Sequence, residues 1–272
     1  MPDNIVTIDF RRHLKLEPGD VLLDLGSGNG RHTIEACLWP CRVVSVDVDA
    51  DELRRARFFL RAPAGGSPWL RYDEQEKPGY PGWADFIVAD AQHLPFKDGA
   101  FDKVMCTEVL EHIPDDKEGI RELHRVARPG ADVAVSVPRY WPERVFWTLS
   151  WEYWHTPGGH VRMYKPGVMA RYLTEHGFQV QAMRHRHAFQ SVYWFLRCTF
   201  GKDNENRLVP RTMWKFINWY QQRRPKKVEF LEAAINLIAG KDLVHYTKKP
   251  AAPSMNGRQR VEEEAPRASA LR

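Results

Sequence analysis

The sequence predicts an α/β fold in which a doubly wound, mostly parallel sheet carries helices on both faces. In the first half of the chain, short apolar runs alternate with helical stretches, which is the pattern of a parallel sheet. A turn with three glycines follows the first apolar run and opens a helix, as in folds that bind nucleotide-like cofactors. The 272 residues suffice for one large domain or for a core with an appended lobe.

Seven strands and a larger set of helices follow from the apolar patterns. We expect strands near 20–25, 43–47, 84–89, 101–106, 131–137, 178–184 and 242–248. We expect helices near 31–38, 50–60, 115–127, 139–154, 166–176, 189–200, 211–223 and 228–239. In the last of these, a single apolar stripe is formed by Val228, Leu231, Ile235 and Ile238.

The chain divides into four segments. Residues 1–138 carry the alternating pattern of the core, and residues 139–164 form an insertion rich in large aromatic side chains. Residues 165–250 end the core sheet and add a helical cap, and residues 251–272 have the composition of a disordered tail. Residues 61–83 are a loop rich in proline and glycine.

Charge is spread unevenly over the chain. The net charge is +5, but from Arg184 onward there are 18 Lys/Arg against 8 Asp/Glu. This basic region indicates either contact with an anionic partner or a solvated surface. An anionic membrane surface is one such partner, and the side chains that would meet it are Arg197, Lys202, Arg211, Lys215, Arg223, Arg224, Lys226 and Lys227.

The four cysteines predict neither disulfides nor a metal site. Cys37, Cys41, Cys106 and Cys198 do not have the C-x-x-C spacing of a zinc or redox motif, so we expect reduced thiols and a cytoplasmic protein. No stretch has the pattern of a membrane span or of a secretory signal. We expect no metal site.

The glycine turn has the spacing G-x-G-x-G, formed by Gly26, Gly28 and Gly30. A dinucleotide fingerprint needs a third glycine where this chain has Arg31, so the spacing speaks against a dehydrogenase. Asp24 lies two residues before the first glycine, and its carboxylate would repel a pyrophosphate. It suits a cationic ligand, such as an amino group or a sulfonium.

A second carboxylate ends the next strand. Asp47 follows the apolar run 42–46, about 20 residues after the first glycine, where a carboxylate can accept hydrogen bonds from ribose hydroxyls. The alternative is that Asp47 belongs to the N-terminus of the following helix.

These features resemble motif I of the class I S-adenosylmethionine (SAM) methyltransferases. The stretch Ala89–Ile113 is similar to the subfamily that acts on quinones, sterols and other small molecules, and Leu123–Gly130 matches the helix and turn before its fifth strand. The resemblance implies a Rossmann-like sheet and SAM as cofactor, with S-adenosylhomocysteine (SAH) as product. The implied cofactor-binding residues are Asp24, Gly26, Ser27, Gly28, Gly30, Asp47, Val48, Asp90, Ala91, Thr107 and Glu108.

The acceptor site is expected after the fifth strand, where open α/β sheets place their substrates. His160 is the candidate general base with Tyr164 as its orienting partner, and Arg162 is a candidate clamp for an anionic group. The alternative is that His160 and Arg162 hold a glycine-rich loop in place. His112 is a further candidate, which the resemblance favours as a turn residue, and His187 has the pattern of a surface residue.

The aromatic insertion supplies a hydrophobic cap through Trp147, Trp151 and Trp154, or else packs into the core. The sequence thus favours a methyltransferase for a hydrophobic small-molecule or lipid-like acceptor. An RNA methyltransferase that uses the basic region, and a non-enzymatic subunit with this fold, are the alternatives. The oligomeric state cannot be deduced.

Overall fold

The computed structural model describes residues 6–61, 81–151, 159–200, 208–223 and 225–251. Its strands are β1 (Val21–Leu25), β2 (Arg42–Asp47), β3 (Trp83–Val88), β4 (Phe101–Thr107), β5 (Ala127–Pro138), β6 (Gln179–Arg186) and β7 (Asp242–Lys248). Its helices are α1 (Arg31–Ala36), α2 (Ala50–Arg61), α3 (Asp116–Val126), α4 (Tyr140–Leu149), α6 (Val168–Glu175), α7 (Ala188–Phe200), α8 (Leu208–Arg223) and α9 (Lys226–Ala239).

The strands form one seven-stranded sheet in the order β3-β2-β1-β4-β5-β7-β6. All neighbours pair in parallel except β7, which is antiparallel to both β5 and β6. This confirms the predicted fold class. The chain runs outward from β1 in both directions, through β2 on one side and β4 on the other, so the carboxyl ends of these two strands flank the crevice where such sheets bind ligands.

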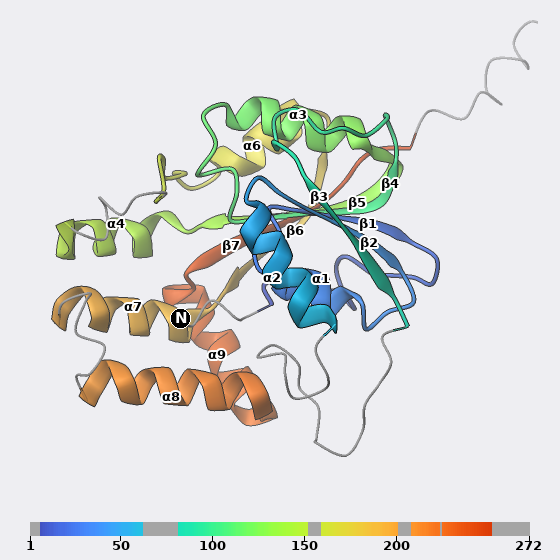
Figure 1. Cartoon of the computed structure of the whole chain (residues 1–272). Helices are drawn as coiled ribbons and strands as arrows, with labels where there is room; N and C mark the ends of the chain where they lie inside the picture. Colours follow the sequence, from blue (N-terminus) through green and yellow to red (C-terminus); the bar gives the residue numbers. More distant parts are fainter. Residues whose placement is uncertain (1–5, 62–80, 152–158, 201–207, 224, 252–272) are drawn as a thin grey trace, which may run out of the picture.

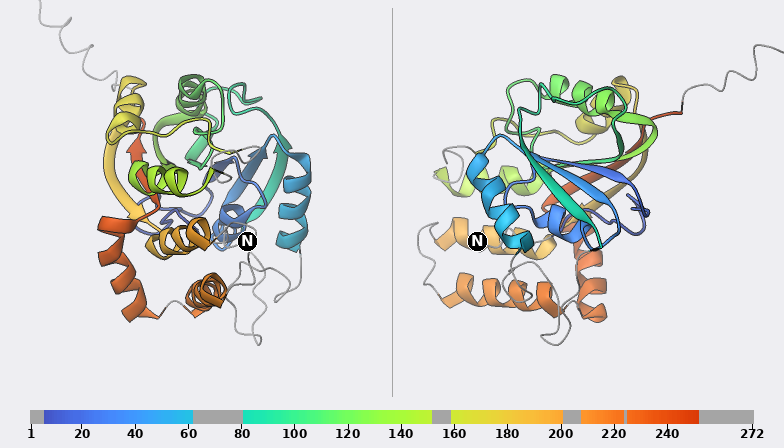
Figure 2. Two further views of the ribbon diagram at one scale, coloured as in Figure 1. Left: turned by 90° about the vertical axis from the view of Figure 1, so that its left-hand side faces the viewer. Right: turned by 45° about the vertical axis from the view of Figure 1, so that its right-hand side comes forward.

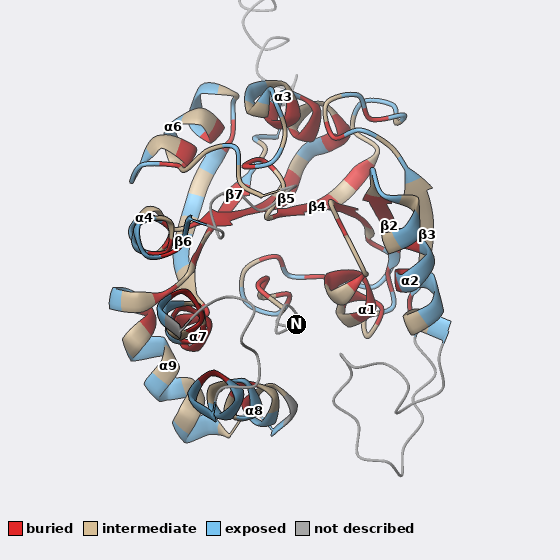
Figure 3. Ribbon diagram, turned by 60° about the vertical axis from the view of Figure 1, so that its left-hand side comes forward, coloured by how far each residue is buried: buried red, intermediate tan, exposed pale blue. Residues whose placement is uncertain are grey.

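Helices cover both faces of the sheet (Figure 1). α3 and α6 lie together on one face, where Ile120, Leu123 and Leu173 are fully buried against the strands. α1 packs on the other face with the N-terminal segment, whose Leu14 is also fully buried. Figure 3 shows that the central strands are buried, whereas the edge strands β3 and β6 and the helices are partly exposed.

The last helices form a layer of their own. α7 contacts α4, α8 and α9, and α9 also contacts β6 at the edge of the sheet; Figure 2 shows α7, α8 and α9 grouped at one end of the molecule. Their shared core is small and aromatic, with Phe189, Tyr193, Ile217 and Tyr220 as its buried members. This helical layer has a hydrophobic cluster separate from those of the sheet.

One expectation about these helices was wrong. The apolar stripe of α9 is buried only in part: Val228 and Ile235 pack against the cluster of the helical layer, whereas Leu231 is 52% and Ile238 83% exposed. Arg197 is not a surface cation: it is 6% exposed and its guanidinium lies over the rings of Tyr193 and Trp194. Lys202 and Arg224 lie outside the described residues.

Two boundaries also differ. β5 begins at Ala127, four residues before the predicted start, because Ala127 already pairs with Phe101 of β4 before the pairing shifts register. α4 ends at Leu149, and Trp154 at the end of the predicted aromatic helix lies outside the described residues. In the part of the chain that the structure describes, no helix combines the length and apolar character of a membrane span.

Candidate functional site

The glycine turn forms an open cradle between β1 and α1. Gly26, Gly28 and Gly30 have φ values of +70°, +51° and +83°, a region that side chains other than glycine rarely adopt. A Cβ added to Gly30 would lie 2.6 Å from the Ala56 Cβ, so that glycine is needed for packing against α2. A Cβ added to Gly28 would meet nothing within 4 Å, which shows that the tip of the turn faces open space.

Asp47 ties this turn to the end of β2. Its Oδ2 accepts a hydrogen bond from the Gly28 N–H at 2.8 Å, and its Oδ1 accepts one from the Asp49 N–H at 2.9 Å. A carboxylate has about four acceptor positions, so two bonds leave capacity for the hydroxyls of a ribose. The residue therefore orders the loop and also stands at the place where the sequence predicts a ribose contact.

Behind the turn lies a buried chain of hydroxyl groups. The Thr33 hydroxyl donates to Asp24 Oδ2 at 2.6 Å, and it lies 3.1 Å from Ser45 Oγ. The Ser45 hydroxyl in turn donates to Ser27 Oγ at 2.7 Å. The Ser27 side chain therefore belongs to this buried network. If Ser27 binds the cofactor as predicted, it would do so through its backbone.

Asp24 is fully buried, and its Oδ1 has no hydrogen-bond partner among the described residues. Burial raises the pKa of its carboxyl to about 7, since the charged form loses its hydration. Leaving a buried acceptor of this kind without a hydrogen bond costs free energy. It fits a ligand that brings a cationic group into the cradle, as the amino acid part of SAM would.

The ends of β2 and β3 offer an apolar surface and a carboxylate beside the cradle. The Val48 side chain is 75% exposed, and Ala91, in the loop after β3, is buried. Asp90 Oδ1 accepts a hydrogen bond from the Gln92 N–H at 2.9 Å, and this bond lowers the pKa of Asp90. These residues stand where the resemblance expects adenine to pack and its amino group to donate.

The end of β4 carries the two residues expected beside the sulfonium. Thr107 Oγ1 lies 3.4 Å from Nδ1 of the buried His32. Glu108 has a left-handed backbone, with φ +56°, and its Oε1 accepts a hydrogen bond from the Ser136 hydroxyl at 3.0 Å. Burial, and next the Asp242 carboxylate, raise the pKa of Glu108 to about 7.

The three polar residues predicted after the fifth strand point to different partners. Arg162 Nη1 and Nη2 donate to the carbonyls of Leu110 and Pro114, at 2.9 and 2.6 Å. The Tyr164 hydroxyl lies 3.0 Å from the same Leu110 carbonyl oxygen and 2.8 Å from Asp116 Oδ2. Both side chains therefore hold the segment between β4 and α3.

His160 faces the other way. Its Nδ1 lies 3.2 Å from Oε2 of Glu143, a fully buried residue of α4. The structure thus gives His160 a carboxylate partner, where the sequence suggested Tyr164. Of the tryptophans expected to line the acceptor site, Trp147 is partly buried, Trp151 is 70% exposed, and Trp154 lies outside the described residues.

Sequence reasoning missed a group of charged residues at the start of β7. Lys241 Nζ lies 3.7 Å from Glu108 Oε2 and 3.2 Å from Asp242 Oδ1. His187 Nδ1 lies 2.5 Å from Asp242 Oδ2, and the side chain is 5% exposed, so its prediction as a surface residue was wrong. Antiparallel pairing sets Asp242 opposite Pro138, and a left-handed residue at position 187 turns the chain inward. No local sequence signal marks this contact.

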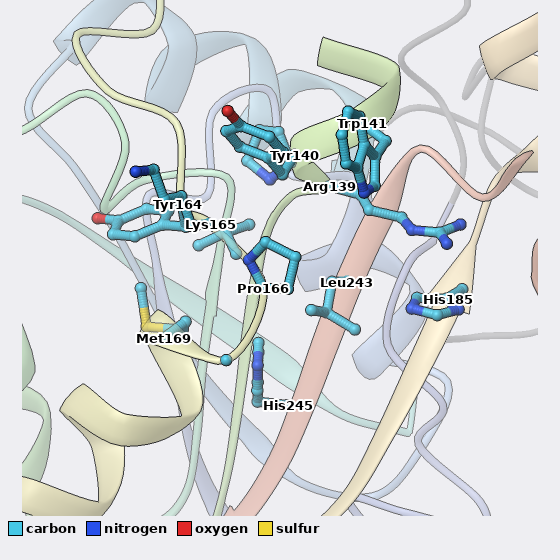
Figure 4. Close-up of a pocket in the computed structure, with 13 residues that line it drawn as sticks. Arg139, Tyr140, Trp141, Tyr164, Lys165, Pro166, Met169, His185, Leu243 and His245 are labelled. Atoms are coloured by element: carbon cyan, nitrogen blue, oxygen red, sulfur yellow. The ribbon is translucent and has the colours of Figure 1, made fainter. Parts of the chain in front are cut away.

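An apolar cavity of about 280 Å³ opens beyond the end of β5 (Figure 4). Tyr140 and Trp141 of α4 cover one side, and Pro166 and Met169 lie opposite. Leu243 and His245 of β7 and His185 of β6 complete the lining. Arg139 at its edge is held by the carbonyls that end α9, since it donates to Leu237 O and Ile238 O.

Comparison with known proteins supports the family. Residues 23–135 match a family described as a methyltransferase domain. The chain is 33% identical to the 27-O-demethylrifamycin SV methyltransferase of Amycolatopsis mediterranei, over 45% of this chain and 40% of that protein. It is 32% identical to the demethylmenaquinone methyltransferase of Corynebacterium urealyticum, over 46% of this chain and 45% of that protein. The matches thus span less than half the length of these curated relatives.

Solved structures share the fold over most of the chain. A SAM-dependent methyltransferase from Methanosarcina mazei superimposes with a TM-score of 0.54 and 17% identity, over 87% of this chain and 95% of that one. The cyclase SpnF gives a TM-score of 0.55 and 18% identity, over 89% and 79% of the two chains. Such distant likeness shows the fold alone. The matched family and the sequence relatives show that residues 23–135 form a methyltransferase domain.

Proposed function

We propose that this protein transfers the methyl group of SAM to a hydrophobic small-molecule or lipid-like acceptor. The observation that carries the proposal is the cradle at the carboxyl ends of β1 and β2. There a glycine turn open at Gly28 lies beside the Asp47 carboxylate that is bonded to it. Asp24, near Asp47, is buried, and among the described residues its Oδ1 has no hydrogen-bond partner. Such a set fits a ligand that has both ribose hydroxyls and a cationic group.

Bound SAM supplies an electrophilic methyl group on a positively charged sulfur. The residues of this chain then have two tasks: to hold the cofactor and to align the acceptor while excluding water. Asp24 would hold the amino group, Asp47 the ribose, and Val48 with Asp90 the adenine. Thr107 and Glu108, at the end of β4, would face the reacting end.

The acceptor side is supported by the chemistry of the cavity and of the relatives. The cavity beyond β5 is lined mainly by aromatic and aliphatic side chains, which suits an apolar group. The relatives from Amycolatopsis and Corynebacterium are named for acceptors of this kind, a demethylrifamycin and a demethylmenaquinone. We propose that the acceptor places its apolar part in this cavity and its reacting atom near His160.

The helical layer supports delivery of an apolar acceptor. On α8 and α9 several large apolar side chains are exposed, among them Leu208 at 78% and Phe230 at 79%. Exposed basic side chains lie on the same two helices, namely Arg211, Lys215, Arg223, Lys226 and Lys227. Apolar and basic groups side by side favour peripheral contact with an anionic membrane surface, from which such an acceptor could be taken.

The test is to incubate the full chain with methyl-labelled SAM and a cell extract, and then to separate solvent-extractable, RNA and polar small-molecule fractions. Label in the solvent-extractable fraction is the expected result. Label confined to RNA would overturn the acceptor class and assign the basic surface of α8 and α9 to phosphate binding. Calorimetry with SAH and NAD tests the cofactor separately, and equal affinities would contradict the SAM assignment.

A further inference from the structure

A cluster of two histidines and a glutamate lies directly after β4. Glu111 and His112 belong to the segment between β4 and α3, and His160 belongs to the segment before α6. One ligand atom from each residue lies within 4.8 Å of the other two. The chain brings them together through backbone pairing, because the Val161 N–H donates to the Glu111 carbonyl oxygen at 3.0 Å.

The environment of the Glu111 carboxylate is the main evidence for a bound cation. Its side chain is fully buried, and neither carboxylate oxygen has a hydrogen-bond partner among the described residues. His112 Nε2 is near, 3.9 Å from Glu111 Oε1. A buried carboxylate without hydrogen bonds is strongly disfavoured as an anion, so it must hold a proton or face a cation. Positive charge acts on this carboxylate from Lys241 through space, and from His112 when that ring is protonated, and a bound cation would stabilise its ionised form further.

Both imidazole rings are oriented by a second oxygen atom. His112 Nδ1 lies 3.2 Å from the Gly159 carbonyl oxygen, and His160 Nδ1 lies 3.2 Å from Glu143 Oε2. These contacts favour the tautomer with hydrogen on Nδ1 and a lone pair on Nε2. Metal-binding histidines in proteins are held in this way, by a carboxylate or a backbone carbonyl behind the ring. The two rings meet edge to face with centroids 4.9 Å apart, so the histidines are direct neighbours.

The surrounding charge also favours a cation. The Glu108 carboxylate acts on Glu111 through space, so two acidic side chains lie near one another at this end of β4. A divalent ion would balance their negative charge. The His112 side chain is 35% exposed, which gives the site a path to solvent.

We infer that Glu111, His112 and His160 bind a divalent transition metal ion, such as Zn²⁺, Mn²⁺ or Fe²⁺. Two imidazoles and one carboxylate are the protein ligands of many catalytic metal sites, and they leave further coordination positions open. With metal–ligand bonds of about 2.0–2.2 Å, the three side chains would have to draw together by about 1 Å. The sequence did not indicate this site, because its ligands are 48 residues apart.

The location of the cluster indicates a role for the open coordination positions of the metal ion. The cluster begins three residues after Glu108, at the strand end that faces the reacting end of the cofactor. On the condition that the proposed methyl transfer is correct, the metal would bind an acceptor oxygen, lower the pKa of its hydroxyl and orient it. The acceptor class is then a hydroxylated apolar molecule. His160 would serve as a metal ligand, and no histidine base would be needed, because the acidified hydroxyl would lose its proton to solvent past His112. The oxygen would then take the methyl group as the S–CH3 bond breaks and SAH leaves.

Metal binding is tested first, without reference to activity. Tag-free full-length protein is titrated with Co²⁺, followed by visible absorption, with Zn²⁺ as competitor. We expect one tightly bound ion per chain. His160→Gln and Glu111→Gln should weaken binding at least 100-fold, and Glu143→Gln, which removes only the orienting carboxylate, should weaken it 10- to 100-fold. The matched control is His93→Gln, since the His93 side chain is 81% exposed and His93 is not one of the three clustered residues.

Absence of a tightly bound ion, or equal binding by all variants, would overturn the site. Glu111→Gln removes a buried charge and should fold, which its melting temperature verifies, and His160→Gln provides a second variant. Transfer of label from SAM is then measured with chelator and after adding back Zn²⁺ or Mn²⁺. Loss and recovery of transfer would support the role at the acceptor, and chelator-insensitive transfer would overturn that role. A loaded site without transfer in any metal state would overturn the proposed function while the metal site stands.

Discussion

Replacement of Asp24 by asparagine tests the electrostatics of the cofactor cradle. Asp24 is fully buried, and burial raises the pKa of its carboxyl from 3.8 to about 7. In the unfolded chain the same group ionises near pH 4, so between pH 4 and pH 7 the folded state holds a proton that the unfolded state has lost. Stability therefore falls as pH rises through this window and levels off above pH 7.

The size of the effect follows from the shift. Each pKa unit corresponds to about 1.36 kcal/mol, so the two units between pH 5 and pH 7 remove about 3 kcal/mol from the free energy of unfolding. Asp24→Asn cannot ionise and should escape this loss. Any constant cost, such as an unpaired amide N–H at the position of Oδ1, is the same at every pH and cancels from the comparison.

The assay is urea unfolding of wild type and Asp24→Asn at pH 5 and pH 8. We expect the difference in unfolding free energy to move in favour of the variant by about 3 kcal/mol between the two conditions. The variant should also bind SAH about 10- to 100-fold more weakly, since a charged hydrogen bond to the amino group is lost. A difference that does not change with pH would refute the reasoning, because it would mean that Asp24 ionises normally in the folded state.

Three further predictions concern the same region. Gly26→Ala should lower the free energy of unfolding by about 3 kcal/mol, because its added Cβ would collide with the Val109 side chain. The control Gly130→Ala should lower it by only about 1 kcal/mol, since Gly130 is also left-handed but its added Cβ has no neighbour within 4 Å. Equal losses in urea unfolding would mean that backbone strain alone is responsible. Asp47→Asn should weaken SAH binding about 10- to 100-fold in calorimetry, while the exposed control Asp85→Asn should leave it unchanged; an equal affinity of both variants would argue against the ribose contact. Addition of SAH at about 100 times its Kd should raise the free energy of unfolding by about 2.7 kcal/mol, and NAD at the same concentration should not.

Local sequence patterns determined the main architecture. Each of the seven strands was predicted within a few residues of its observed bounds, because alternation of short apolar runs with helical stretches reports directly which segments must be buried. The proximity of the glycine turn to Asp47 could also be predicted from the sequence. Gly28 and Asp47 each follow a predicted strand closely, so parallel pairing alone places them at one edge of the sheet.

Only the tertiary structure decided what lies on the acceptor side. The Glu143 partner of His160, the Asp242 partner of His187 and the proximity of Glu111 to His160 all depend on contacts between segments far apart in the chain. The physical reason is that local sequence patterns cover only a few residues, whereas these contacts join distant segments. Periodicity and turn chemistry act over a few residues, and they fix which side of an element is buried. Which buried polar groups meet depends on the antiparallel insertion of β7 and on the packing of α4, and neither leaves a local mark in the sequence.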